Sequence, residues 1–376
     1  MNLSRTEAKL LAWWSFAIAI KRSCGLTTVS IFLASLLKKS EAATRQQARE
    51  WLWDKKDKAG KKRQDWEVEE CFAGLLRWVL SLWPAGEKRI ALAMDATTLK
   101  ARFTVLAISV VFCGCGIPIA WVVLPATGKK GWKGEWLRLF TRLEGIIPED
   151  WLVIVMADRG LYANWLFESI RENGWHPFLR INQGGKYRPE GASEFCELTK
   201  VLKGVGDSWT GVVTCFKSNP VKATLLAKWE EKYTDPWLIL TDLSPEQAQI
   251  SWYGMRAWIE CCFKAIKRAG WDWQNTRMTD PKRAARLWLA IAVATLWAVT
   301  VGGEADDHLP VSSLADLPET HVARRHHTTA NSRPARSFSL FHRGLTEILV
   351  SILRGELVLP RPITFSIWAP LAPANP

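Results

Sequence analysis

The stretch from Val105 to Pro125 limits the possible folds most, because none of its 21 residues carries a charge. That length would suit a helix that crosses a membrane. Gly114, Gly116 and Pro118 stand at its centre, however, and runs of β-branched residues lie on both sides of them. Glycine and proline inside an apolar run are typical of a turn between two strands. We therefore expect a hairpin of two buried strands.

Two other apolar runs each carry an aspartate near the carboxyl end. A strand predicted at residues 89–99 contains Asp95, and a strand that begins at residue 151 ends in Asp158. Further helices and a strand at 176–182 give an order of elements typical of an α/β protein with a mixed sheet. Ligands bind at the carboxyl ends of strands in such sheets. Either aspartate alone could instead cap the following turn.

The net charge of +13 indicates a polyanionic partner, either nucleic acid or an anionic membrane surface. We interpret the apolar segment Leu287–Val301 as a buried helix, because it is short and follows a basic, helix-forming lead-in, and so we expect no membrane association.

The eight cysteines lack zinc-ligand spacing and are expected to be reduced and mostly buried. No secretory signal is evident at the start of the sequence, which favours a cytoplasmic protein.

Changes in periodicity and composition divide the chain into five predicted regions. They are an N-terminal helical DNA-binding domain at 1–85, the first part of the α/β core at 86–182, a β-rich insertion at 183–247, the second part of the core at 248–303, and a basic, partly disordered region at 304–376. A basic run at 55–63 is either a solvated loop or a phosphate-binding segment. The last region contains basic patches at 324–327 and 333–336 and a predicted amphipathic helix at 345–354.

A helix predicted over residues 251–267 carries one polar stripe. At about 100° per residue, Tyr253, Arg256, Glu260 and Lys267 fall within an arc of about 60°, and the other faces are apolar. A buried helix with one ordered polar stripe faces something polar. The alternative is that Arg256 and Glu260 form an ordinary surface pair one helical turn apart.

A third carboxylate from this helix would complete a site for a hard divalent cation. Asp95, Asp158 and Glu260 would supply carboxylate oxygens, which Mg²⁺ and Mn²⁺ prefer. Asp242 lies at the end of another predicted strand and is a rival for the third position. We rank Glu260 above it, because the Thr-Asp-Leu context of Asp242 is typical of a structural turn.

Three motifs together resemble a known family. They are Met94-Asp95-Ala96-Thr97, Ala157-Asp158-Arg159-Gly160-Leu161, and the pattern Tyr-x2-Arg-x3-Glu-x6-Lys at residues 253–267. The chain thereby resembles the DDE transposases of bacterial insertion sequences, and the last pattern resembles the YREK signature of the insertion-sequence-four group. The resemblance covers about residues 89–300. It implies an RNase H-like core interrupted by a β-rich insertion between the second aspartate and the glutamate.

The resemblance also implies an activity. A cut-and-paste transposase binds the inverted repeats at transposon ends, cleaves the DNA and joins the free 3′-OH to target DNA. Asp95, Asp158 and Glu260 would be its catalytic residues and would hold two Mg²⁺ ions, for which Mn²⁺ substitutes. The competing hypothesis is a non-catalytic DNA-binding or regulatory derivative that keeps the fold and the basic surface.

The implied partner is double-stranded DNA, both transposon ends and target. By resemblance, Tyr253, Arg256 and Lys267 contact phosphates at the transposon end, although Arg256 could instead orient Glu260. Some members of the group flip a base onto a Trp of the insertion, for which Trp229 and Trp237 are candidates; core packing explains either equally well. A homodimer in the synaptic complex and a location at the bacterial nucleoid are expected.

Overall fold

The computed structural model describes residues 3–58, 65–128, 131–231, 233–307, 339–363 and 368. Parts of three sequence-based expectations therefore lie outside the described residues. They concern the basic residues at 61–63, the basic patches at 324–327 and 333–336, and the disorder expected of the C-terminal region.

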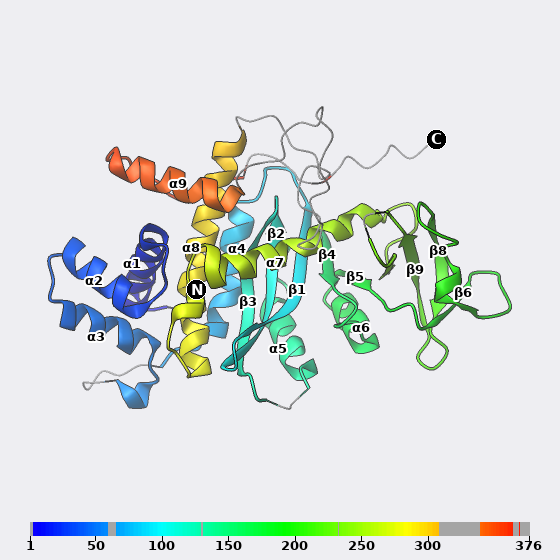
Figure 1. Ribbon diagram of the computed structural model, residues 1–376, viewed down its shortest axis with the longest axis horizontal. Helices are drawn as coiled ribbons and strands as arrows, with labels where there is room; N and C mark the ends of the chain where they lie inside the picture. The colour runs from blue at the N-terminus through cyan, green and yellow to red at the C-terminus, as the bar shows by residue number, and fades with distance from the viewer. Residues whose placement is uncertain are drawn as a thin grey trace.

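Three helices form the N-terminal part of the chain: α1 (Arg5–Lys21), α2 (Leu26–Leu36) and α3 (Glu41–Leu52). Helix α1 begins at a capping box in which the Ser4 hydroxyl accepts from the Glu7 N–H and the Glu7 carboxylate accepts from the Ser4 N–H. Figure 1 shows these helices beside α8 (Pro281–Asp307), which α1 and α3 contact. After two short 3₁₀ turns, α4 (Phe72–Ser81) leads into the sheet.

One mixed sheet of ten strands runs through the described chain, in the order β3-β2-β1-β4-β5-β10-β9-β8-β6-β7. The first five are β1 (Arg89–Leu99), β2 (Phe103–Phe112), β3 (Cys115–Pro125), β4 (Leu152–Ala157) and β5 (His176–Arg180). Strands β1, β2 and β3 are antiparallel, whereas β4 and β5 run parallel to β1. The predicted α/β class and the buried hairpin at 105–125 are therefore confirmed.

The segment between β5 and the next helices continues the same sheet. It contains β6 (Lys186–Pro189), β7 (Cys196–Glu197), β8 (Ser208–Cys215), β9 (Val221–Lys228) and β10 (Trp237–Thr241). Strand β10 pairs antiparallel with β5, and β9 pairs antiparallel with β10. The residues expected to form an insertion thus extend the core sheet, at the right of Figure 1.

Helices cover both faces of the first strands, and β2 is therefore buried at every position. The remaining helices are α5 (Lys133–Leu143), α6 (Asn164–Glu172), α7 (Trp258–Lys264), α8 and α9 (Leu340–Leu353), and α4, α5, α7 and α8 all contact β3. Helix α9 includes most of the helix expected at 345–354. The eight cysteines are unbridged, and six of them are buried, as expected.

Helix α8 contains the segment Leu287–Val301 that the sequence indicated as a buried helix. Within the described chain, Pro281–Glu304 is the one unbroken helix long and apolar enough to cross a membrane, and 94% of the tested window is buried inside the protein. A core helix of a globular protein has these properties. The interpretation of this segment as a buried helix is confirmed.

The expectation of one regular helix at 251–267 is wrong. Residues Ile250–Ala257 form a 3₁₀ helix, Trp258–Lys264 form α7, and Ala265–Ala269 form a π-helix. A uniform turn of about 100° per residue therefore does not hold along the segment. In the 3₁₀ part, residues three apart lie on one edge, so Tyr253 and Arg256 project from the same side.

Candidate active site

The sheet places Asp95 and Asp158 level with each other. In the parallel pairing of β1 with β4, Ala93 is opposite Met156, and each aspartate lies two residues further along its chain. Strand β4 ends at Ala157, so Asp158 is the first residue after it. The Ala96 N–H donates to Asp95 at 2.7 Å, and the Gly160 N–H donates to Asp158 at 2.9 Å, which orients both carboxylates.

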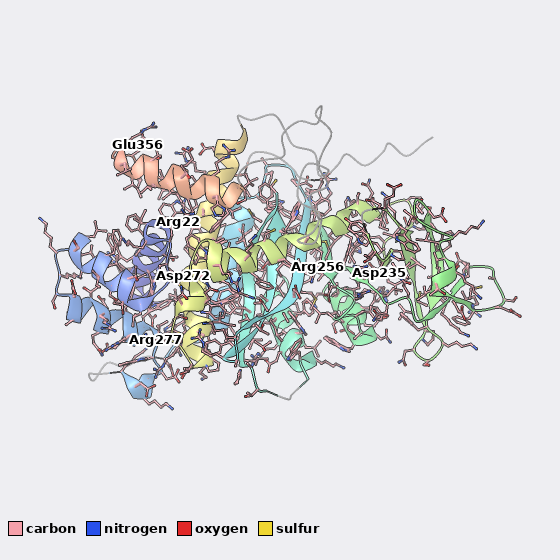
Figure 2. The ribbon with its side chains drawn as sticks, viewed as in Figure 1. Arg22, Asp235, Arg256, Asp272, Arg277 and Glu356 are labelled. Atoms are coloured by element: carbon pink, nitrogen blue, oxygen red, sulfur yellow. The ribbon has the colours of Figure 1, made fainter. Side chains whose placement is uncertain are left out.

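The guanidinium of Arg256 joins three carboxylates. Its Nη2 lies 2.8 Å from Oδ2 of Asp95 and 3.4 Å from Oδ2 of Asp158. Its Nη1 donates to Oε1 of Glu260, one turn along the helical segment. The Arg256 side chain is only 11% exposed, so its contact with Glu260 is part of a partly buried cluster and not an ordinary surface pair. Figure 2 places Arg256 where the helical segment passes the sheet.

Helix α7 comes close to the sheet because β3 has a glycine beneath it. A Cβ on Gly116 would lie 2.9 Å from the Cβ of Cys262 and 3.4 Å from the carbonyl oxygen of Trp258. The backbone of β3 therefore contacts α7 directly. This close packing carries Glu260 on α7 toward the aspartates.

The cluster holds more negative than positive charge. Burial raises the pKa of the Asp95 carboxyl to about 6; Asp158 and Glu260 act in the same direction, and Arg256 opposes them. Burial lowers the pKa of Arg256, but the surrounding carboxylates outweigh this effect and leave its pKa above the ordinary value. One arginine faces three acids, so the cluster can accept further positive charge.

Tyr253 supports the cluster from behind. Its hydroxyl donates to the carbonyl oxygen of Ala157 at 3.3 Å, directly before Asp158. The side chain is buried, and burial raises its pKa, so the hydroxyl stays neutral near neutral pH. The structure brings Tyr253 to the aspartates through the main chain of β4.

Lys267 lies in the π-helix and is half-buried. Burial lowers the pKa of its ammonium group; Arg268 acts in the same direction, and the Asp95 carboxylate opposes them. Lys267 has no ion-pair partner among the residues that the structure describes. Its ammonium group is therefore available to an anion near the carboxylates.

The two candidate tryptophans have different surroundings. Trp237, on β10, is buried between the rings of Tyr233 and Tyr253, whose centroids lie 4.9 and 5.1 Å away. Trp229 is half-buried, and its indole N–H donates to the carbonyl oxygen of Tyr233 at 3.1 Å. The structure places Trp237 against the site through Tyr253, whereas Trp229 keeps part of its surface open.

Asp242 lies at the opposite end of the strands from Asp95 and Asp158. Because β10 runs antiparallel to β5, its carboxyl end points away from the ends of β1 and β4. The Asp242 carboxylate contacts Nδ1 of His176 at 3.0 Å, at the start of β5, and Arg171 at 3.6 Å. Strand direction therefore separates Asp242 from the carboxylate cluster.

The donor chemistry of the cluster fits a divalent cation such as Mg²⁺, which prefers carboxylate oxygens. Arg256 occupies the space between these donors, and in the described part of the chain no three acidic, His or Cys side chains are already arranged around one point. The residues therefore have the ligand atoms that a metal ion needs. Binding of one ion by all three carboxylates requires the guanidinium of Arg256 to move aside.

Sequence reasoning missed the contact of Arg256 with both aspartates. The stripe on the helix linked Arg256 only to Glu260, four residues away. Its bond to Asp95 spans 161 residues, and no local pattern reports such a contact. Asp242, in contrast, is excluded from the carboxylate cluster by one property of the fold, the direction of β10.

A family model described as "Transposase DDE domain" matches residues 86–297. The match covers more than half of the chain and includes the three carboxylates and Arg256. The chain therefore belongs to the transposase DDE domain family.

No curated protein matches the chain. Among solved structures, it is similar to a piggyBac transposase in a synaptic complex with hairpin DNA, at 12% identity over 54% of this chain and 45% of that chain, with a TM-score of 0.36. It is also similar to human ENDOV, at 12% identity over 55% of this chain and 83% of that chain, with a TM-score of 0.26. The chain thus spans less than half the length of the piggyBac transposase chain. At these TM-scores neither likeness bears on function.

Proposed function

We propose that this protein is a cut-and-paste DNA transposase of the insertion-sequence-four group, with Asp95, Asp158 and Glu260 as its catalytic carboxylates. The observation that supports this most is the meeting of these three side chains at the guanidinium of Arg256. They come from two strand ends and a helix, and they lie within the family match.

The three carboxylates would hold two Mg²⁺ ions, or Mn²⁺ in their place. When bound, such ions activate a water molecule for attack on a phosphodiester and stabilise the leaving oxygen. Ionised carboxylates are needed for this role, and an Asp95 pKa of about 6 leaves that group mostly ionised at neutral pH. Arg256, once released from the carboxylates, would be free to bind a DNA phosphate through two N–H groups.

Cleavage would free a 3′-OH at each transposon end, and the same carboxylates would serve the joining of that end to target DNA. Both steps exchange phosphodiester bonds without a covalent enzyme intermediate, so positioning and charge neutralisation carry them. Arg256 and Lys267 are proposed to hold the end DNA directly, and Tyr253 is proposed to support them through its hydrogen bond to the main chain before Asp158. Of the two tryptophans, Trp229 suits a flipped base better, because Trp237 is packed between two tyrosines.

Double-stranded DNA, both transposon ends and target, is the proposed partner, and a homodimer is the proposed synaptic unit, acting at the bacterial nucleoid. The net charge of +13 supports binding to DNA. In this proposal residues 1–85 form the helical DNA-binding domain, and residues 86–182 and 248–303 form the catalytic core around the β-rich residues 183–247. Residues 304–376 form the C-terminal region, whose basic patches at 324–327 and 333–336 are proposed to contact DNA.

Nicking of DNA that carries the terminal repeats flanking the gene tests the proposal. Asp95→Asn, Asp158→Asn and Glu260→Gln should each reduce Mg²⁺-dependent nicking by about 10³-fold or more, since a metal ligand and a negative charge are lost. Binding of the same DNA, measured by gel shift, should persist.

Asp242→Asn is the matched control, because it removes a carboxylate at the other edge of the sheet, and it should nick at the rate of the unsubstituted protein. Normal nicking by one of the three variants would remove that residue from the assignment. If the unsubstituted protein shifts the DNA but cleaves it in neither Mg²⁺ nor Mn²⁺, the non-catalytic derivative is the correct reading.

A further inference from the structure

A cleft of about 650 Å³ lies between the N-terminal helices and the loop that follows the helical segment of the site. Its walls come from the start of α2, from α3, from residues 272–280 and from the first two turns of α8. Figure 2 labels Asp272 and Arg277 on this loop, beside the N-terminal helices and away from Arg256. The cleft is thus distinct from the carboxylate cluster.

Three arginines of the cleft are uncompensated. Arg45, Arg49 and Arg277 line it, and none of them has an ion-pair or hydrogen-bond partner among the described residues. A fourth, Arg283, is bound to Asp57 at 3.2 Å and lies 3.8 Å from Asp280. Even with Asp272 counted, the cleft carries an excess of positive charge.

The walls of the cleft are fixed by two other arginines. Arg102 donates to the carbonyl oxygens of Gln274, Thr276 and Met278, and so holds the backbone on both sides of Arg277. Arg286, only 2% exposed, donates to the carbonyl oxygen of Leu52 at 2.8 Å and anchors the end of α3. The backbone is therefore held while the arginine side chains remain available, an arrangement that lowers the entropy cost of binding.

The spacing on α3 also indicates a ligand. Arg45 and Arg49 are four residues apart and share one face of the helix, where like charges repel each other and destabilise the helix. A polyanion between them would remove this repulsion. Further donors line the same cleft: the hydroxyls of Ser23, Thr27 and Thr28, beside the start of α2. Hydroxyls and arginines are typical donors to DNA phosphates.

Several basic residues lie along the sequence between the catalytic cluster and the cleft. After Glu260 come Lys264, Lys267 and Arg268, and then Arg277. Figure 1 shows this helical segment crossing the sheet toward α8 and the N-terminal helices. A ligand that starts at the carboxylates and continues along this path must be long and negatively charged.

From these observations we infer that the cleft binds the sugar–phosphate backbone of the DNA duplex whose end lies at the carboxylates. Arg45, Arg49 and Arg277 neutralise its phosphates. The inference rests on the proposed function and adds to it the residues of the N-terminal helices and of the 272–280 loop that contact the duplex away from the reacting atoms.

The test compares two triple variants in binding to a fluorescently labelled DNA duplex of about 20 base pairs, two helical turns. One variant is Arg45→Gln, Arg49→Gln, Arg277→Gln. The charge-matched control is Lys200→Gln, Lys203→Gln, Lys222→Gln, three exposed lysines at the far end of the sheet. Fluorescence anisotropy at several salt concentrations gives the slope of log K against log[salt].

The arginine variant should lose about one unit of slope for each arginine and bind roughly ten-fold or more weakly near 0.1 M salt. The lysine control should keep nearly the original slope. Equal losses in both variants, or no loss in the arginine variant, would overturn the inference. Circular dichroism melting of both variants detects misfolding, and single substitutions at Arg277, an exposed loop position, supply a second measurement if α3 is perturbed.

Nicking by the unsubstituted protein on DNA with the terminal repeats tests the proposed function separately. If it nicks and the arginine variant binds normally, only the cleft assignment fails. If it never nicks but the arginine variant loses binding, the cleft assignment stands and the catalytic proposal fails.

Discussion

Arg256 and Arg286 are both buried and both contact acidic side chains, yet their acceptors differ in kind. Arg286 donates to the carbonyl oxygens of Leu52 and Trp66 at 2.8 and 3.0 Å, and its Nη2 lies 2.9 Å from Asp54. Among the residues that the structure describes, Arg256 has only carboxylate acceptors. Its Nε is buried without a hydrogen-bond partner in the described chain.

This difference separates a scaffold from a site. A main-chain carbonyl has no other use once the fold is formed, so a buried carbonyl that loses its donor costs free energy. A carboxylate can exchange one cation for another. Arg286 is therefore a permanent part of the fold, whereas under the proposed function Arg256 would give way to a metal ion and a DNA phosphate.

The largest effect expected from this comparison is on stability. Arg286→Met leaves two buried carbonyls and nearby carboxylates without their donor, so it should lower the free energy of unfolding by about 3 kcal/mol or more. Urea unfolding followed by tryptophan fluorescence measures this. Arg283→Met, on the same helix but one-third exposed, is the control and should cost less than about 1 kcal/mol. Equal losses would contradict the special role of Arg286.

A smaller effect should appear in the pH dependence of stability. The pKa of Asp95 lies near 6 in the folded protein, above its ordinary value of 3.8, so ionisation of this group costs stability as the pH rises from about 4 to about 6. Asp95→Asn removes that cost. The variant should be more stable than the unsubstituted protein by about 2 kcal/mol at neutral pH.

Below the ordinary pKa both side chains are neutral, so the stability difference should vanish there. Urea unfolding of the two proteins across this pH range measures it. A constant difference at all pH values would show that packing, and not charge, distinguishes the two side chains.

The smallest effect is on metal affinity without DNA. Arg256→Gln removes the cation between the carboxylates while keeping a side chain of similar reach, so Mn²⁺ should bind about ten-fold more tightly, a change of about 1.4 kcal/mol. Calorimetric titration with Mn²⁺ alone measures this. Arg171→Gln, beside Asp242, is the control and should leave the affinity unchanged. Weaker binding by Arg256→Gln would mean that the guanidinium helps to assemble the metal site.

Much of the scaffold could be predicted from the sequence, because it depends on local patterns. The glycines and proline inside an uncharged run indicated the β2–β3 hairpin, and apolar strands that carry aspartates indicated one edge of a mixed sheet. Spacing along the chain also indicated that Tyr253, Arg256 and Glu260 share a side. The change from 3₁₀ to α to π within one helical segment has no such pattern.

Contacts between distant segments could not be predicted. The bond between Arg256 and Asp95 depends on how α7 packs on the sheet, and the pairing of β10 with β5 decides on which edge Asp242 lies. The cleft likewise requires the N-terminal helices and the 272–280 loop to be placed together in space.

Gly116 shows how far the requirements of the site extend into the hairpin. The helix that carries Glu260 can contact the backbone of β3 only because position 116 has no Cβ. The position of the Glu260 carboxylate thus depends on the absence of a side chain at residue 116, on a strand that contributes no charged side chain to the cluster. In the family, the range of residues tolerated at this position should be as narrow as at an acidic position, although the constraint is one of volume and not of charge.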